Sequence, residues 1–165
     1  MRSFYLDASA LAKRYIPETG SSLIDEILDK VSGDRIYVLN VGAGEVVSIL
    51  IRKRNAGTIT DAYFRQALLD FESEIVRSAD INKLAISNRL ATSSFGPIVA
   101  HSINSTDAIT LRSALAIAQK LRAGADDLVL VASDLRLLRA AQAEGLNTFN
   151  PESQDNTALA ALLGP

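Results

Sequence analysis

Short aliphatic runs alternate with longer amphipathic segments along this chain, and that alternation limits the folds it can adopt. The runs SFYLD, RIYVLN and DLVLVAS are rich in β-branched and aromatic residues and are typical of strands. The segments GAGEVVSILIRKRNAG and STDAITLRSALAIAQKLRAG repeat apolar residues at helical spacing. Strands that alternate with helices pair in parallel, because each helix carries the chain back across a face of the sheet. The pattern predicts an α/β fold: a three-layer α/β/α sandwich with a central parallel sheet of about five strands.

The expected strands lie at residues 3–7, 35–40, 83–87, 127–133 and 146–150. The third has the weakest pattern, and the helix expected after it is interrupted at Gly96 and Pro97. A chain of 165 residues fits one domain with a sizeable core. We expect that domain to span residues 1–150, and residues 151–165 to form a C-terminal tail that is loose or packed as a short helix on a partner.

The composition narrows the chemistry that is possible. The chain has no cysteine and one histidine, His101, which excludes disulfides, thiolate sites and a histidine-rich zinc centre. Any metal site must use oxygen ligands, which suit magnesium, manganese or calcium. No apolar run approaches the roughly 20 residues of a membrane span, and MRSFYLD reaches an acid too early for a signal peptide, so we expect a cytoplasmic protein. The formal net charge of −2 gives no electrostatic case for nucleic-acid binding by the whole chain.

Acidic residues recur where expected strands end and where the following helices begin. In an open parallel sheet, ligands bind outside the carboxyl ends of the strands, because crossover loops and helix N-termini gather at that edge. Asp126 and Asp127 precede a strand and therefore belong to the opposite edge. The acids assigned to the ligand-binding edge are Asp7, Glu45, Asp107 and Asp134.

Each of these four acids also has an ordinary structural explanation. Acids favour helix N-caps and first turns, where they contribute about 0.5–2 kcal/mol. Four carboxylates from distant segments at one edge repel each other, however, unless they are protonated or neutralised by cations. A divalent cation held by carboxylates polarises a phosphoryl oxygen and lowers the pKa of bound water. The set predicts phosphodiester hydrolysis by metal-bound water, since no cysteine or nearby histidine is available as a nucleophile.

Hydroxyl and basic residues beside the four acids are secondary candidates. Ser9 and Ser133 flank the first and last acids, and each either caps a helix or holds a water or phosphate oxygen. Lys13 and Arg14 follow the first strand and are candidates for contacts with a phosphate backbone. Arg52 lies seven residues after the glutamate, which at about 100° per residue puts it on the same helix face. Arg52 either contacts a substrate phosphate or is simply exposed to solvent at the end of its helix.

The sequence resembles the PIN-domain nucleases, and within them the VapC-type toxins of toxin-antitoxin pairs, in the stretches YLDASALAKRYIPE, GAGEVVSILIRKR, STDAITLRSALAIA and LVLVASDLRLLRAAQAEGLNTFNPE. The resemblance implies a PIN-like nuclease domain and an Mg²⁺- or Mn²⁺-dependent endoribonuclease acting on RNA. It assigns the catalytic and metal-binding roles to Asp7, Glu45, Asp107 and Asp134. With RNA as the substrate, the phosphate contacts considered above for Lys13, Arg14 and Arg52 would be contacts with the RNA backbone. Ser133 stands where the family carries a small hydroxyl residue.

The same resemblance implies a homodimer and a cognate antitoxin whose tail occupies the active-site groove. The match is uneven along the chain, because the stretch from Ile59 to Asn104 agrees only in outline. The approach to Asp107 reads HSINST, where the family would suggest basic or apolar residues.

Two other functions remain open at this point. A PIN-like domain can be catalytically silent and act by binding a protein, since an apparent site does not prove turnover. An acid that ends a first strand is also the covalent nucleophile of some phosphatases and phosphotransferases. Those enzymes usually need a second acid two residues further on, where this chain has Ser9, so this alternative is disfavoured.

Overall fold

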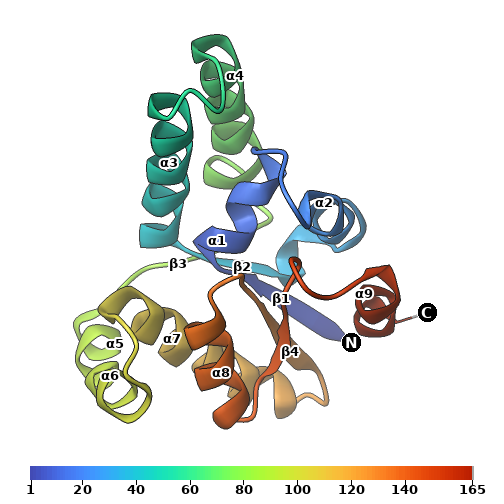
Figure 1. Cartoon of the computed structure of the whole chain (residues 1–165). Coiled ribbons are helices and arrows are strands. Elements are labelled where there is room, and N and C mark those ends of the chain that lie inside the picture. The colour runs from blue at the N-terminus through green and yellow to red at the C-terminus, as the bar shows by residue number, and fades with distance from the viewer. Residues whose placement is uncertain (165) are drawn as a thin grey trace.

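A parallel sheet forms the centre of the molecule. The computed structural model describes residues 1–164, and Figure 1 shows its elements. The strands run parallel in the order β3-β2-β1-β4-β5. They are β1 (Arg2–Leu6), β2 (Ile36–Leu39), β3 (Asn82–Leu84), β4 (Asp127–Val131) and β5 (Asn147–Phe149). Each overlaps one of the runs expected from the sequence, the weakly patterned third run included.

Helices and short turns connect the strands. In chain order they are α1 (Ala8–Leu11), η1 (Ala12–Arg14), α2 (Ser21–Lys30), η2 (Gly33–Arg35), α3 (Asn40–Asn55), α4 (Asp61–Phe71), η3 (Glu72–Val76), α5 (Asn88–Ser93), α6 (Phe95–His101), α7 (Ser105–Arg122), α8 (Leu135–Ala143) and α9 (Asn156–Leu163). Within residues 1–164, no helix combines the length and the apolar character that a membrane span requires.

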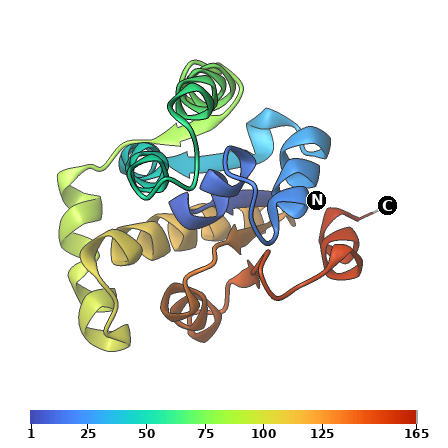
Figure 2. The same cartoon turned by 45° about the horizontal axis from the view of Figure 1, so that its top comes forward.

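Alternate residues of the strands build two cores, one on each face of the sheet. Phe4 and Leu6 belong to the core that packs against α1–α4 and α9, whereas Tyr5 belongs to the core beneath α7 and α8. Figure 1 shows these two groups of helices on opposite sides of the sheet. Figure 2 shows α5 and α6 at one side of the molecule and α9 at the other. The predicted three-layer α/β/α sandwich is confirmed.

The strand order reverses between β1 and β4. The chain passes from β1 through β2 to β3 beneath α1–α4, and then returns through α7 on the other face to reach β4. Where two neighbouring strands send their connections to opposite faces, a crevice opens at their carboxyl ends. β1 and β4 pair from Arg2 opposite Asp127 to Leu6 opposite Val131. The residues that follow these two strands therefore lie at this switch point.

The interrupted helix breaks earlier than the sequence suggests. α5 ends at Ser93 and α6 begins at Phe95, whereas Gly96 and Pro97 lie inside the first turn of α6. Proline is tolerated there because the N–H groups of a first turn have no partner within the helix.

Helix α9, which falls in the expected C-terminal tail, packs on the core of its own chain. Leu159 is fully buried in the same core as Phe4, and the Arg2 guanidinium donates a hydrogen bond to the Ala161 carbonyl at 2.6 Å. Figures 1 and 2 show α9 near the N-terminal end of the chain. Residues 156–163 are therefore an ordered part of the fold and not a loose segment.

Candidate active site

Carboxylates from four separate elements line one open cavity at the switch point. Asp7 follows β1, Glu45 lies in α3, Asp107 lies in α7 and Asp134 precedes α8. The cavity has a volume of about 340 Å³ and is lined by Asp7, Ala8, Ser9, Glu45, Ser48, Ile49, Arg52, Asp107 and Asp134. The fold thus brings together the four acids that the sequence assigned to one edge of the sheet.

Asp7 and Asp134 are helix N-caps as well as cavity residues. Asp7 Oδ2 accepts hydrogen bonds from the Ser9 amide at 3.1 Å and the Ser9 hydroxyl at 2.7 Å. Asp134 Oδ1 accepts from the amides of Arg136 at 2.7 Å and Leu137 at 3.2 Å. Capping holds both carboxylates at the strand ends. The same side chains can therefore stabilise a helix and serve as metal ligands.

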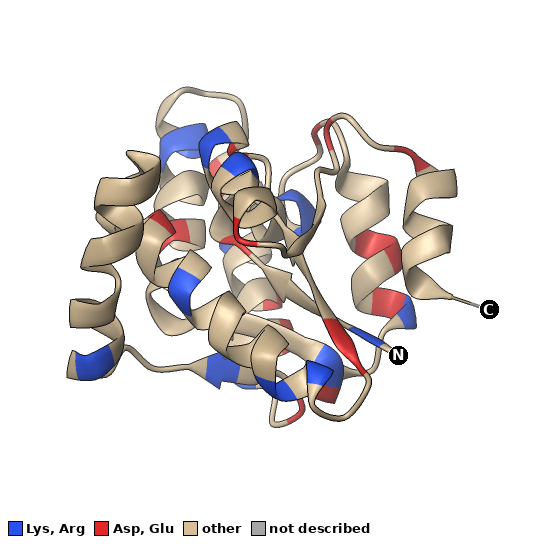
Figure 3. Cartoon of the chain, turned by 90° about the horizontal axis from the view of Figure 1, so that it is seen from below, with Lys and Arg blue, Asp and Glu red and all other residues tan. Residues whose placement is uncertain are grey.

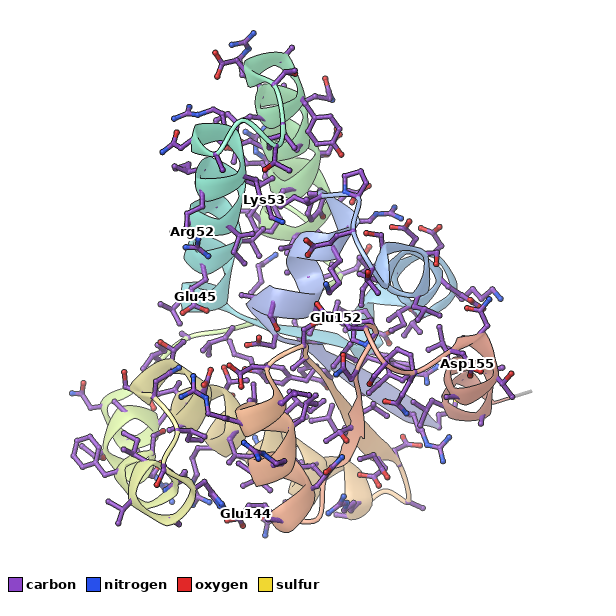
Figure 4. All side chains as sticks on the ribbon, viewed as in Figure 1. Glu45, Arg52, Lys53, Glu144, Glu152 and Asp155 are labelled. Carbon is purple, nitrogen blue, oxygen red and sulfur yellow. The ribbon has the colours of Figure 1, made fainter. Side chains whose placement is uncertain are left out.

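Glu45 and Asp107 reach the cavity from helix faces. Glu45 is in the second turn of α3, and Figure 4 shows it at the end of that helix nearest the sheet. Asp107 is in the first turn of α7, whose N-cap is Asn104. Asn104 Oδ1 accepts from the Asp107 amide at 2.9 Å, and Asn104 Nδ2 donates to Asp107 Oδ2 at 2.8 Å. This reciprocal pair, similar to a capping box, fixes the Asp107 carboxylate against the helix end.

Burial and mutual repulsion raise the pKa values of three of the acids. Burial raises the pKa of Asp7, and hydrogen bonds from Ser9 oppose that increase. Burial and then the charge of Asp7 raise the pKa of Glu45. Burial, followed by the charges of Asp7, Asp134 and Glu45, raises the pKa of Asp107 to about 6. The acids therefore act on one another electrostatically, as carboxylates that share a site do.

The groups around the cavity fit a hard divalent cation. Carboxylate oxygens are the ligands that magnesium and manganese prefer. The Ser133 hydroxyl is buried beside Asp134 and has no hydrogen-bond partner within residues 1–164. Across the same residues, no three Asp, Glu or His side chains approach closely enough to hold an ion between them as they stand. Mutual repulsion explains why four carboxylates can share a cavity without converging on one point.

Ser9 and Ser133 connect the ends of the two central strands. The Ser133 amide donates to the Ser9 hydroxyl at 3.0 Å, and that hydroxyl donates to Asp7 Oδ2. The chain of hydrogen bonds links the loop after β4 to the carboxylate after β1. Ser9 therefore positions the Asp7 carboxylate relative to the loop after β4. The sequence predicted only helix capping or ligand binding for this residue.

The basic residues selected from the sequence lie in different places. Arg52 lines the acidic cavity, and Figure 4 shows it further along α3 from Glu45 on the same side of the helix. Lys13 is only 2 % exposed, and its Nζ lies 3.1 Å from Glu18 and 2.6 Å from Glu152. Burial and these two carboxylates disfavour the expected contact of Lys13 with an RNA backbone.

Arg14 is also turned away from the acidic cavity. Its guanidinium nitrogens lie 3.1 Å from Asp25, 3.1 Å from Asp29 and 3.3 Å from Glu74. It lines a separate cavity between α2 and α4. These three carboxylates disfavour the expected contact of Arg14 with an RNA backbone, because η1 directs the side chain toward α2 and not toward the acidic cavity.

Three further residues belong to the site although the sequence analysis did not select them. Ser48 lines the cavity one turn after Glu45 on α3. Thr106 hydrogen-bonds to the Glu45 side chain and partly offsets the increase in pKa that burial causes. Arg136 likewise opposes the increase in the pKa of Asp107 that burial and the other acids produce. Their spacing from the acids, three residues or fewer along the chain, was the only sequence signal available.

Comparisons with known proteins identify the fold. No model of a protein family matches the sequence, and no curated protein matches it significantly. The solved structure of PAE2754 from Pyrobaculum aerophilum is similar with a TM-score of 0.63 and 18% identity, covering 97% of this chain and 94% of that chain. Mycobacterium tuberculosis VapC20, described as a Sarcin-Ricin loop cleaving toxin, gives a TM-score of 0.59 and 15% identity, covering 93% and 100%.

FitAcB from Neisseria gonorrhoeae is similar with a TM-score of 0.56 and 14% identity, and the match covers 92% of this chain and 99% of that chain. At these identities the likeness concerns the fold. The PIN-like α/β fold predicted from the sequence is confirmed.

Proposed function

We propose that this protein is a metal-dependent endoribonuclease that hydrolyses RNA phosphodiester bonds. The observation that carries the proposal is the acidic cavity, in which carboxylates from the end of β1, from α3, from α7 and from the β4–α8 loop gather at the switch point of the sheet. Structural carboxylates would be paired with bases or spread over the surface, whereas Asp7, Asp134 and Glu45 together raise the pKa of Asp107. The likeness in fold to a toxin described as cleaving the Sarcin-Ricin loop supports RNA as the substrate.

Asp7, Glu45, Asp107 and Asp134 would hold Mg²⁺ or Mn²⁺, with the Ser133 hydroxyl nearby. When bound, such an ion neutralises the carboxylates, polarises a phosphoryl oxygen and makes an attacking water available at neutral pH.

The chain's own groups would bind and orient the substrate. The Ser9 hydroxyl fixes Asp7 Oδ2, so that the carboxylate keeps one orientation. Arg52 lines the same cavity, where its charge opposes the increase in the pKa of Glu45, and it forms no ion pair within residues 1–164, so its guanidinium is available to a phosphate. Asn104 holds Asp107 in place from the helix cap.

We also propose that the protein is the toxin of a toxin-antitoxin pair, acting as a homodimer in the cytoplasm and inhibited by a cognate antitoxin. The sequence resemblance to VapC-type toxins supports this, together with the likeness in fold to VapC20. Expression of the intact protein should arrest bacterial growth, whereas expression of the Asp7→Asn variant should not. A reading frame for a short DNA-binding protein beside this one would favour the same conclusion.

A second candidate function is a catalytically silent domain that works by binding a protein. One observation favours it: within residues 1–164 the acids do not close around a common point. Under this alternative the carboxylates would serve as helix caps and would contact basic residues of a partner.

A cleavage assay separates the two functions. Labelled single-stranded RNA is incubated with the full chain while MgCl₂ or MnCl₂ is titrated. We expect cleavage that depends on the ion, stops with EDTA and is lost in Asp7→Asn. Asp126→Asn, at the opposite edge of the sheet, is the matched control and should cleave as the wild type does. Cleavage that survives both EDTA and Asp7→Asn would exclude the acidic cavity as the active site, and metal binding without cleavage would support the silent domain.

A further inference from the structure

A second cavity with the opposite charge lies beside the acidic one. It has a volume of about 260 Å³ and is lined by His101, Ser102, Arg136, Arg139 and Ala140. No acidic residue lines it. Figure 3 shows basic and acidic residues interspersed over the molecule seen from below. A cavity lined by two arginines and no acid differs from this mixed pattern.

The two arginines project from one face of α8. Arg136 and Arg139 are three residues apart, which places them side by side on the helix. Within residues 1–164 neither forms an ion pair, and the only side-chain hydrogen bond of Arg139 runs from Nε to the Leu135 carbonyl at 3.2 Å. The terminal guanidinium groups thus retain donors for a ligand, in the geometry that suits a phosphate.

The opposite wall of this cavity is the C-terminal end of α6. His101 Nε2 lies 2.7 Å from Glu144 Oε1, so a carboxylate is paired with the imidazole on this wall. Figure 4 shows Glu144 at the end of α8 that is remote from Glu45. A helix C-terminus carries about half a negative charge. The two guanidinium charges of Arg136 and Arg139 outweigh this half charge and the Glu144 carboxylate together, so the cavity favours an anion.

Arg136 connects the two cavities. Its amide donates to Asp134 Oδ1 at 2.7 Å, and its side chain lines the basic cavity. Its positive charge also acts on Asp107, where it opposes the increase in pKa caused by burial and the neighbouring acids. An extended chain of phosphates could therefore pass from the acidic cavity directly to the basic one.

We propose that the basic cavity formed by Arg136, Arg139 and Ser102 binds a backbone phosphate of the RNA strand, one or more nucleotides away from the scissile bond. This inference rests on the proposed function, because it assigns the path of the same substrate. It also replaces Lys13 and Arg14 as the source of backbone contacts: those residues are occupied by carboxylates, whereas α8 presents its arginines beside the acids.

The test measures RNA binding without turnover. All variants are made in the full-length Asp7→Asn background, in EDTA, and binding of a labelled single-stranded RNA is followed by fluorescence anisotropy over a range of salt concentrations. Arg139→Gln should weaken binding about fivefold at low salt and should reduce the slope of log K against log[salt] by about 0.7, the value for one lost phosphate contact. Arg139 is exposed, so the variant should keep its thermal midpoint.

Lys120→Gln is the matched control, because it removes one exposed positive charge from the C-terminal end of α7, whereas Asp107 and the acidic cavity lie at its N-terminal end. It should leave both the affinity and the salt slope unchanged. Equal effects of Arg139→Gln and Lys120→Gln, or the absence of RNA binding at any salt concentration, would overturn the proposed site. Strong thermal stabilisation by inorganic phosphate alone, reduced by Arg139→Gln, would also overturn it, because it would indicate a site for a free anion.

Failure of the proposed function gives a different result. If the wild-type chain does not cleave RNA with Mg²⁺ or Mn²⁺ but Arg139→Gln still weakens RNA binding, the phosphate site stands and the nuclease activity does not. If the wild type cleaves RNA and Arg139→Gln binds it normally, the activity stands and the phosphate site does not.

Discussion

Asp7 and Asp134 each cap a helix and line the acidic cavity, and this double role determines which substitution is informative. Asparagine also caps helices well, so Asp→Asn removes the charge while it keeps the hydrogen bonds to the helix. Alanine would remove both, and it would confuse a loss of stability with a loss of function.

Asp7→Asn should make the protein more stable in EDTA at neutral pH while it abolishes cleavage. The substitution removes a buried carboxylate that raises the pKa values of Glu45 and Asp107 by repulsion. We expect an increase in the thermal midpoint of about 2–4 °C, measured by circular dichroism. Asp126→Asn, which breaks only an exposed pair with the terminal amine, should give no increase. A lower midpoint for Asp7→Asn would contradict the repulsion.

The stability of the metal-free protein should decrease as the pH rises through the titration of Asp107. Its pKa is raised from 3.8 in a free chain to about 6 in the fold. The folded state therefore binds the proton more tightly than the unfolded state, so this contribution is complete below about pH 4 and is lost as the pH rises through about 6. Urea denaturation at pH 4.5 and at pH 7 in EDTA measures it. In Asp107→Asn the free energy of unfolding should differ less between pH 4.5 and pH 7 than it does in the wild type.

Along α3, neighbouring basic residues have different tasks. Arg52 lines the acidic cavity, whereas Lys53 turns toward the loop before α2, where its Nζ lies 3.0 Å from Glu18 Oε2. Figure 4 shows the two side chains on different sides of the helix. Consecutive residues of a helix point about 100° apart around its axis. Arg52 can therefore face the substrate while Lys53 forms a structural ion pair.

Arg52→Gln should therefore raise the KM for RNA by about threefold to tenfold, because one charged hydrogen bond to the substrate is lost. Its free energy of unfolding should stay within about 0.5 kcal/mol of the wild type, as is usual for an exposed side chain. Lys53→Gln should show the reverse pattern, with unchanged KM. Steady-state cleavage and urea denaturation measure the two effects, and an unchanged KM for Arg52→Gln would remove Arg52 from the substrate site.

The turn η1 is held by the buried Lys13, whose two carboxylate partners come from the loop before α2 and the loop after β5. Burial would raise the pKa of Glu18, but hydrogen bonds from Lys53 and Lys13 outweigh it and lower that pKa. Glu18→Gln should destabilise the protein by about 1–3 kcal/mol in urea denaturation, because it leaves a buried ammonium with one charged partner. Glu26→Gln, which breaks only an i,i+4 pair with Lys30, should cost less than about 0.5 kcal/mol.

At the scale of the whole molecule, α9 covers one end of the core beside the start of β1. Leu159 is fully buried, and α9 is tied to β1 through Arg2. Leu159→Ala should cost about 2–4 kcal/mol of unfolding free energy through lost burial and the resulting cavity. Leu135→Ala, at a site that is 63 % exposed, is the control and should have little effect. Chemical denaturation gives both values, and equal effects would show that α9 does not contribute to the core.

Much of the fold and the candidate site could be predicted from the sequence, for identifiable reasons. The strand ends placed Asp7 and Asp134, because a parallel sheet sends its connections to fixed edges. Asp107 depended on the weak strand before α5, and β3 is indeed present at Asn82–Leu84.

The direction of side chains after a strand could not be predicted. Lys13 and Arg14 were placed near the acids by sequence distance, but their orientation depends on η1 and on partners up to 139 residues away. The packing of α9 was equally hidden, because TALAALL is apolar enough to pack on this chain or on another. Contacts between segments that are distant in the sequence produce no local periodic pattern, so these contacts could not be predicted from the sequence.

The pairing of β1 with β4 also fixes when the acidic cavity can exist during synthesis. Asp7 is synthesised long before Asp134, because β4 follows β1, β2 and β3 in the chain. A nascent or truncated polypeptide that lacks β4 has neither the strand that seats against β1 nor the fourth acid. The cell therefore cannot hold a partly translated form of this protein with its cavity complete.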